Sequence, residues 1–465
     1  MSPTVQAKAR PFQQRERICV SHYPPPSQPV APGTISDVLG LQSDAMPRNP
    51  LAMYIHIPFC DRICTFCPFN KQIMREQRLA NYLEALFQEI EIYGRSAFIQ
   101  RAEFGSLAIG GGTPSCLSAA QIEALMNHCR RHFRFTEGVE VTMEGNPSNF
   151  DLEKLKVAFA AGVNRVSFGV QSFNDEFGAM LEIPQTADKS REAIANARKA
   201  GFDNVGIDLI YNLPGQTPAQ WQADVDEAIA LEVDHITLFS LIVPPMTKLF
   251  KQIDKQMLPS PNGIGYESQL YLQAAGSLRA AGYRQYSVYD FAKPGKVNLH
   301  AQLYFSQWRD LLGLGTAAFG YLNGFMYVNK GDLAAYQDTV TSGTLPVWVG
   351  TKADDGEAMC GAMAKGLRLL EVDKRAFEAR FGRAPAQVFG EKITSLMDKG
   401  LLADTGDRLS LTEEGIFWGN NICREFFSPQ GLANEKLPRE ILARGKAPTT
   451  HKPFRAEPSQ QRPNN

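Results

Sequence analysis

The 465-residue sequence has few cysteines, no long apolar run and almost no net charge. Its longest apolar stretches, such as residues 235–243, fall well short of the roughly 20 residues that span a bilayer. The polar N-terminus has no apolar core of the signal-peptide kind. A formal net charge of -1 gives no sign of a nucleic-acid partner. We therefore expect a cytoplasmic protein without a membrane span.

The chain has only 8 cysteines, and Cys60, Cys64 and Cys67 lie in one short segment. Such clustering in a long chain does not resemble a disulfide framework. The spacing CxxxCxxC favours a metal centre, because three soft thiolates in one loop can hold three corners of an iron–sulfur cubane. The alternative is a zinc site completed by His56. That histidine lies inside a predicted strand, and structural zinc usually draws on paired CxxC ligands.

From residue 53 onward, β-rich runs alternate with runs whose apolar residues recur near helical spacing. The strands are expected at residues 53–59, 106–112, 139–146, 165–172, 204–213 and 235–243. The helices are expected at residues 78–94, 118–133, 152–161, 187–200 and 217–231. This alternation predicts an α/β fold, a partial (β/α)6 barrel with functional residues at the carboxyl ends of its parallel strands.

Composition divides the rest of the chain. Residues 1–50 contain Tyr23 followed by three prolines and predict an extended lead-in. Residues 51–345 are expected to form the barrel with extra C-terminal strands. Residues 355–430 predict a small α+β, winged-helix-like domain, and residues 446–465 a disordered tail.

The segment from Tyr54 to Cys67 resembles the radical S-adenosylmethionine (SAM) superfamily, specifically its oxygen-independent coproporphyrinogen III oxidase-like family, in the class C methyltransferase branch. The resemblance implies a [4Fe–4S] cluster on Cys60, Cys64 and Cys67, whose open iron binds SAM. It also implies reductive cleavage of SAM to a 5′-deoxyadenosyl radical, with an electron donor such as flavodoxin or ferredoxin. One or two SAM molecules are expected.

Later strand ends resemble the family segments that line the SAM pocket. They are the Gly-Gly-Gly-Thr-Pro run at residues 110–114, Glu-Gly-Asn-Pro at 144–147, Gly-Val-Gln at 169–171 and the segment at 207–217. The resemblance assigns SAM contacts to Tyr54, Phe66, Gly111, Gly112, Thr113, Glu144, Gln171 and Asp208. A buried carboxylate such as Asp208 needs hydrogen-bond donors, which ribose hydroxyls would supply. No further catalytic residue is assigned.

Segments 286–295 and 312–320 resemble the heme-chaperone branch, where Phe319 and Tyr321 would offer an apolar wall to a planar ligand. Three positions depart from relatives. Phe69 stands where coproporphyrinogen oxidases have another cysteine, and His300-Ala301 where chaperones have His-Asn. Ile183 replaces an arginine that contacts a SAM carboxylate, for which Lys189 or Arg191 would have to substitute.

Three hypotheses follow. The first is a radical enzyme that adds a one-carbon unit to an sp² carbon of a planar substrate, such as a heme-like tetrapyrrole or a quinone. The second is a heme chaperone, supported by His300 and Tyr304. The third is hydrogen abstraction without methyl transfer, including oxidative decarboxylation of the coproporphyrinogen type, against which Phe69 counts.

Overall fold

Six parallel strands in chain order form the centre of the main sheet. They are seen in the computed structural model, which describes residues 10–17 and 22–435. Each strand pairs with the next in parallel register. The strands are β2 (Leu51–Ile57), β5 (Glu103–Gly111), β6 (Arg134–Gly145), β7 (Arg165–Gln171), β8 (Val205–Tyr211) and β9 (His235–Ser240). The six expected strands are therefore all present, and the sheet is open rather than closed.

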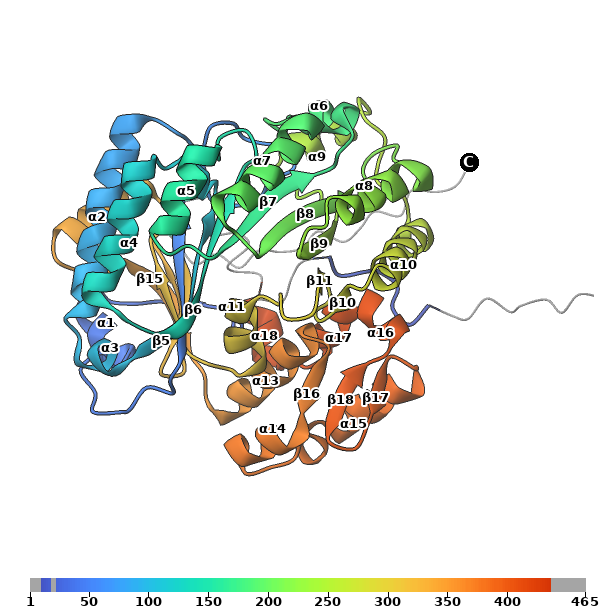
Figure 1. The fold of residues 1–465 in the computed structure, drawn as a ribbon. Coiled ribbons are helices and arrows are strands. Elements are labelled where there is room, and N and C mark those ends of the chain that lie inside the picture. Colours follow the sequence, from blue (N-terminus) through green and yellow to red (C-terminus); the bar gives the residue numbers. More distant parts are fainter. Residues whose placement is uncertain (1–9, 18–21, 436–465) are drawn as a thin grey trace, which may run out of the picture.

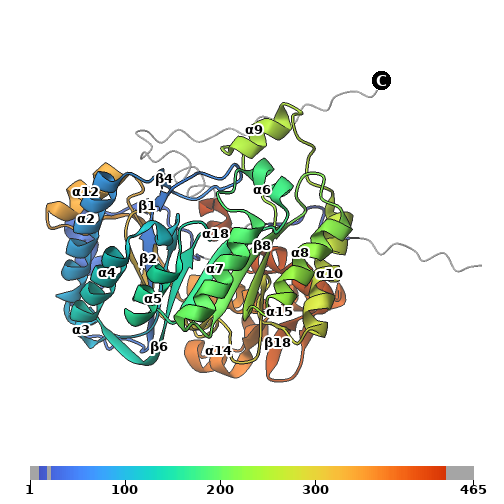
Figure 2. The same cartoon turned by 45° about the horizontal axis from the view of Figure 1, so that its top comes forward.

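Helices cover one face of these strands as an outer layer (Figures 1 and 2). Their ends follow local signals: Ser118 and Thr217 each begin a helix with a capping box, and Gly201 ends one with φ 106°. The helices are α2 (Glu76–Gly94), α4 (Ala119–His132), α5 (Leu152–Ala160), α7 (Ala187–Ala200) and α8 (Pro218–Ala230).

The alternation of side chains along β2 separates the helix-covered face from the inner face. Met53, Ile55 and Ile57 belong to the large core that includes apolar residues of α2 and α4. Ala52 belongs to a second cluster, and Tyr54 packs against the edge of that cluster. Because successive side chains of a strand point to opposite faces, the even-numbered positions of β2 face inward.

Further strands extend the sheet on both sides. β12 (Leu311–Leu314) lies parallel to β2, and the antiparallel strands β13 (Phe319–Leu322), β14 (Phe325–Asn329) and β15 (Val347–Lys352) follow. β1 (Gln28–Pro29) pairs with β15, so the lead-in adds an edge strand. On the far side β9 is followed by β11 (Asp290–Ala292) and β10 (Arg284–Gln285).

The C-terminal part has its own antiparallel sheet of β16 (Glu371–Asp373), β18 (Arg408–Leu411) and β17 (Leu402–Asp404). The helix α13 (Asp355–Arg368) precedes this sheet (Figure 1). The helices around and after it are α14 (Lys374–Phe381), α15 (Pro385–Asp398), α16 (Glu413–Phe417), α17 (Gly419–Glu425) and α18 (Pro429–Asn434). The expected tail at 446–465 lies outside the described residues.

Two expectations about local structure need correction. β6 begins at Arg134, five residues before the expected start, because Arg134 and Phe135 pair with Glu103 and Phe104 at the beginning of β5. The lead-in is not extended throughout, since Ile35–Val38 forms the short helix α1. In the described residues, no helix is long and apolar enough to cross a membrane.

Candidate functional site

The cysteine loop follows β2 and is fixed by backbone hydrogen bonds on both sides. The amide of Gln72 donates to the carbonyl of Pro58 at 2.7 Å, and that of Met74 to Cys60 at 2.9 Å. Thr65 connects the loop to the helix α6 (Asp175–Leu181), because its amide donates to the Leu181 carbonyl at 3.0 Å. The loop that carries the three cysteines is thus held in one conformation.

The three cysteine side chains lie close enough to influence one another. Cys60 is buried, whereas Cys64 and Cys67 are partly exposed. Burial, together with the neighbouring Cys67 and Cys60, raises the pKa of the Cys64 thiol to about 12. Such thiols ionise when a metal takes the place of the proton.

The spacing of the sulfurs fits a cluster better than a single ion. Among the described residues, they are not part of any group of three ligand atoms that all lie within 4.8 Å of one another. A tetrahedral zinc ion would hold two thiolates roughly 3.8 Å apart, given Zn–S bonds of about 2.3 Å. A cubane binds each thiolate through a separate iron, which suits a wider set of soft donors.

The triple-glycine turn after β5 lies directly against the cysteine loop. A Cβ at Gly112 would lie 2.7 Å from the Phe59 carbonyl oxygen, and one at Gly111 would lie 2.6 Å from the His56 ring. Gly111 also has φ 115°, which side chains rarely adopt. The amide of Thr113 donates to the Phe59 carbonyl at 2.7 Å. Only glycine permits this approach, so the run is more than an ordinary turn.

Two carboxyl groups lie within electrostatic reach of each other, Glu144 near the carboxyl end of β6 and Asp208 in the middle of β8. Burial and then the charge of Glu144 raise the pKa of Asp208 to about 7, while a hydrogen bond from Thr237 opposes the rise. Burial also raises the pKa of Glu144, which accepts from the Gly111 amide at 3.3 Å. Glu144 nevertheless keeps exposed surface.

Tyr54 lies within electrostatic reach of Glu144, and Gln171 lies at the end of β7, the strand between β6 and β8. Burial and then the charge of Glu144 raise the pKa of Tyr54. Gln171 ends β7 with φ 69°, an uncommon value for a residue other than glycine. Its amide nitrogen lies 2.7 Å from where a Cβ of Gly169 would be. The backbone therefore turns this side chain over the strand end.

Phe66 lies on the other side of the cysteine loop. It packs with Cys64 against an apolar cluster that contains Ile183 and Leu181. Ile183 is therefore a core residue beside the loop. Lys189 and Arg191, the two cations considered in place of the missing arginine, both form ion pairs on the outer helices α7 and α8. Lys189 donates to Glu192 at 2.6 Å, and Arg191 to Glu227 and Asp188, each at 2.7 Å.

An aromatic wall continues inward from Tyr54. Tyr304 and Tyr321 belong to the cluster against which Tyr54 packs. Phe319, on the same strand as Tyr321, is stacked on His22 with ring centres 4.1 Å apart. His22 comes from the lead-in, to which sequence reasoning assigned no chemistry. Since only the fold brings His22 here, no pattern in the sequence marks it.

Lys365 is a second residue that sequence reasoning missed. Its Nζ lies 4.3 Å from the ring centre of Tyr304 and 4.7 Å from that of Tyr321. Burial, with Arg380 nearby, lowers the pKa of Lys365 to about 7. Among the described residues, no carboxylate lies within ion-pair distance of this nitrogen. The sequence does mark this residue, because Lys365 is a charged residue inside the otherwise apolar run 359–367.

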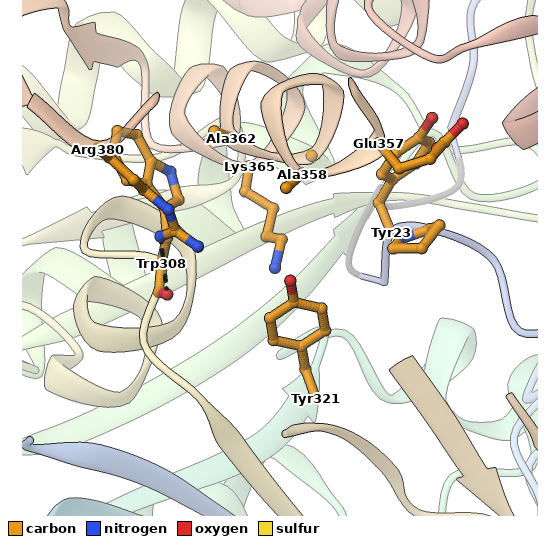
Figure 3. A pocket seen from close by; sticks show the side chains of 10 residues that line it. Tyr23, Trp308, Tyr321, Glu357, Ala358, Ala362, Lys365 and Arg380 are labelled. Atoms are coloured by element: carbon orange, nitrogen blue, oxygen red, sulfur yellow. Dashed lines mark hydrogen bonds between the residues drawn. The ribbon is translucent and has the colours of Figure 1, made fainter. Parts of the chain in front are cut away.

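A small cavity adjoins the wall on the side of α13 (Figure 3). Lys365 points toward Tyr321, with Arg380 and Trp308 on one side and Glu357 on the other. The indole Nε1 of Trp308 is buried without a hydrogen-bond partner among the described residues. A buried donor of this kind is costly. The cavity is therefore lined by two basic side chains, Lys365 and Arg380, together with Trp308 and Glu357.

His300, the chaperone candidate, is engaged in the wall of the barrel. Its Nδ1 lies 3.1 Å from the Ser106 Oγ, and its amide donates to Glu140 at 3.2 Å. Burial lowers the pKa of this imidazole to about 4. Phe69 is 65% exposed, so it is not part of the core beside the cysteine loop.

These features define a radical SAM enzyme, and the model of the radical SAM superfamily matches residues 54–228. Within that superfamily the chain belongs to the family of the oxygen-independent coproporphyrinogen III oxidase and the heme chaperone HemW. The model of the HemN C-terminal domain matches residues 354–418. Membership implies a [4Fe–4S] cluster and SAM as cofactors, which the thiolate loop and the glycine turn fit.

Three relatives illustrate the range of the family. The chain is 33% identical over 378 residues to the heme chaperone HemW of Bacillus subtilis, covering 80% of this chain and 98% of that protein. It is 31% identical over 390 residues to the anaerobilin synthase of Escherichia coli O157:H7, covering 83% and 85%. The structure of coproporphyrinogen III oxidase (HemN) from Escherichia coli superposes with a TM-score of 0.76 at 27% identity, covering 87% and 96%. This confirms the expected α/β radical SAM fold with extra C-terminal strands.

Proposed function

We propose that this chain is a radical SAM enzyme whose substrate is a tetrapyrrole that carries carboxylate groups. One observation carries the proposal: the cysteine loop, the glycine turn and the Glu144–Asp208 pair adjoin an aromatic wall that begins at Tyr54 and ends at Lys365. A planar conjugated ring would stack on such a wall. The names of all three relatives above refer to tetrapyrrole compounds.

The residues have separate tasks in this proposal. Cys60, Cys64 and Cys67 would hold the cluster, which supplies the electron that cleaves SAM. Backbone groups of the glycine turn would bind the methionyl part of SAM, and Asp208 its ribose hydroxyls. Tyr54 and Phe66 would shield the site from water, which limits loss of the radical to side reactions.

The narrower expectation of methyl transfer has no support from the comparisons, which favour its two alternatives, tetrapyrrole oxidation and heme binding. The departure at Ile183 also leaves a second SAM molecule without its usual cation, since Lys189 and Arg191 are engaged elsewhere. We therefore favour radical oxidation of the tetrapyrrole with one bound SAM.

Anaerobic incubation of the reconstituted enzyme with SAM, a reductant and heme or coproporphyrinogen tests the proposal. We expect 5′-deoxyadenosine to increase at least tenfold when the correct tetrapyrrole is present, because a bound target should couple cleavage to product formation. Mass analysis should show a modified tetrapyrrole. A one-carbon mass gain would instead restore the methyl-transfer hypothesis, and deoxyadenosine without any altered tetrapyrrole would contradict the proposal.

A heme chaperone is the second candidate, favoured by the similarity to HemW. A carrier would bind one heme tightly, pass it to an apoprotein and return it unmodified. Heme titration of the wild type and of His300→Ala separates the two functions. Transfer of unmodified heme, with no product after SAM cleavage, would support the carrier.

We predict that Lys365→Met raises KM for the tetrapyrrole by roughly 10- to 100-fold and leaves kcat nearly unchanged. A charge-assisted hydrogen bond to a carboxylate contributes about 1.5–3 kcal/mol, and each 1.4 kcal/mol is tenfold in affinity. Lys399→Met is the matched control, because Lys399 also lies over an aromatic ring but at an exposed site. The wild type should bind the esterified tetrapyrrole as weakly as the variant binds the acid. An equal KM for acid and ester would exclude this role for Lys365.

A further inference from the structure

Two helices of the outer layer bring three metal-ligating side chains together, away from the cysteine loop. His128 and His132 are one turn apart on α4, and Glu91 faces them from α2 (Figures 1 and 2 show the helices side by side). One ligand atom from each residue can be chosen so that all three lie within 4.8 Å of one another. Residues four apart on a helix share a face, which is why a His-x-x-x-His pair can chelate one ion.

The distances are close to those of a bound ion. His128 Nε2 lies 3.6 Å from Glu91 Oε1 and donates to the Phe87 carbonyl at 3.1 Å, so an ion bound at Nε2 would displace this hydrogen bond. Ligands about 2.1 Å from a tetrahedral zinc ion are roughly 3.4 Å apart. The His128 and His132 rings have centres 4.8 Å apart, so a small side-chain rotation would bring their nitrogens onto one ion.

Neighbouring groups hold the ligands in place. His128 is stacked on Phe87 with ring centres 4.6 Å apart. Arg95 donates to Glu91 Oε2 at 2.9 Å, which leaves Oε1 directed at His128.

A simpler interpretation is that Glu91 and His128 form an ion pair. An ion pair does not require His132, whose ring faces the same point from the next turn. Arg131 lines the adjoining surface hollow and Arg95 pairs with Glu91, so two cations oppose a metal ion there.

We infer that Glu91, His128 and His132 form a binding site for one divalent ion of the zinc class. Two imidazoles and a carboxylate are a common zinc donor set, and His128 also lines a surface hollow together with Glu123 and Asn127. The ion would join α2 to α4. This matters for the active site because Tyr82 of α2 donates to the carbonyl of His56 at the end of β2.

The test uses protein whose iron–sulfur cluster is already loaded, so that the cysteines cannot take up zinc. After zinc addition and anaerobic desalting, metal analysis should find one zinc per chain besides four irons, and Tm should rise until one equivalent is bound. His132→Asn and Glu91→Gln should each lower the retained zinc at least tenfold. Glu123→Gln, which changes a carboxylate of the hollow, should retain it.

Each other outcome would overturn the inference. If the cluster-loaded wild type retains no zinc, the three side chains are an ordinary polar contact between helices. If both variants keep a full equivalent, the zinc is bound elsewhere. Circular dichroism and Tm without zinc show whether the variants fold. Because Glu91 and His132 lie outside the proposed SAM site, this result is independent of the proposed function.

Discussion

Cys64→Ala should abolish the iron–sulfur cluster and, with it, all reductive cleavage of SAM. The loop supplies three thiolates, and a cubane held by two of them loses one of its iron attachments to the protein. Cys64 packs beside Phe66 and Ile183 in an apolar cluster. Alanine at this position would leave a small cavity there, and the cluster has no second thiolate to bind the iron. Iron and sulfide analysis should fall from about four per chain to below one, and deoxyadenosine to background.

Cys116→Ala is the matched control for this experiment. Cys116 ends the short helix after the glycine turn, and Cys60 and Asp61 lie near enough to help raise the pKa of its thiol. It is thus a cysteine beside the loop but outside the CxxxCxxC spacing. The control should keep four irons and its activity. A full cluster in Cys64→Ala, or its loss in Cys116→Ala alone, would show that the ligand assignment is wrong.

The fold was predictable because the hydrophobic pattern and the helix-capping residues indicate the same strands and helices. In β2, alternating residues separate a helix-covered face from an inner face, and Ser118 and Thr217 mark helix starts by their capping boxes. Pairing between distant segments was not predictable. The lead-in strand β1 pairs with β15, and Arg17 of the lead-in pairs with Glu267 at 2.6 Å. Such contacts depend on the finished fold.

The proximity of the candidate SAM residues was predictable for a different reason, because they lie on consecutive strands of one parallel sheet. Parallel strands bring their carboxyl ends to one edge, so Gly111, Glu144, Gln171 and Asp208 had to be neighbours once the strands were known. Thr237 could not be assigned in advance, since its hydrogen bond to Asp208 depends on the register of β8 and β9. A sequence pattern can identify residues that lie next to a motif. It does not identify hydrogen-bond partners that depend on the register between two strands.

Asp208→Ala should weaken SAM binding about 10- to 100-fold and leave the cluster intact. The carboxylate would accept hydrogen bonds from ribose, and a hydrogen bond to a charged group contributes about 1.5–3 kcal/mol. Titration of cluster-loaded protein with SAM measures the affinity. Asp234→Asn is the control, because Asp234 accepts from the Val205 amide at the opposite end of β8. Equal affinity of Asp208→Ala and the wild type would make Asp208 a structural residue.

The pH dependence of the same titration distinguishes a charged acceptor from a neutral one. Burial and the charge of Glu144 raise the pKa of Asp208 to about 7, so this group is protonated below that pH in the free protein. A protonated carboxyl accepts more weakly, and binding that requires the charged form must release a proton. Wild-type affinity should therefore fall as pH decreases from 8 to 6, and Asp208→Ala should lose most of this slope. An unchanged slope in the variant would assign the titration to another group, of which Glu144 is the nearest.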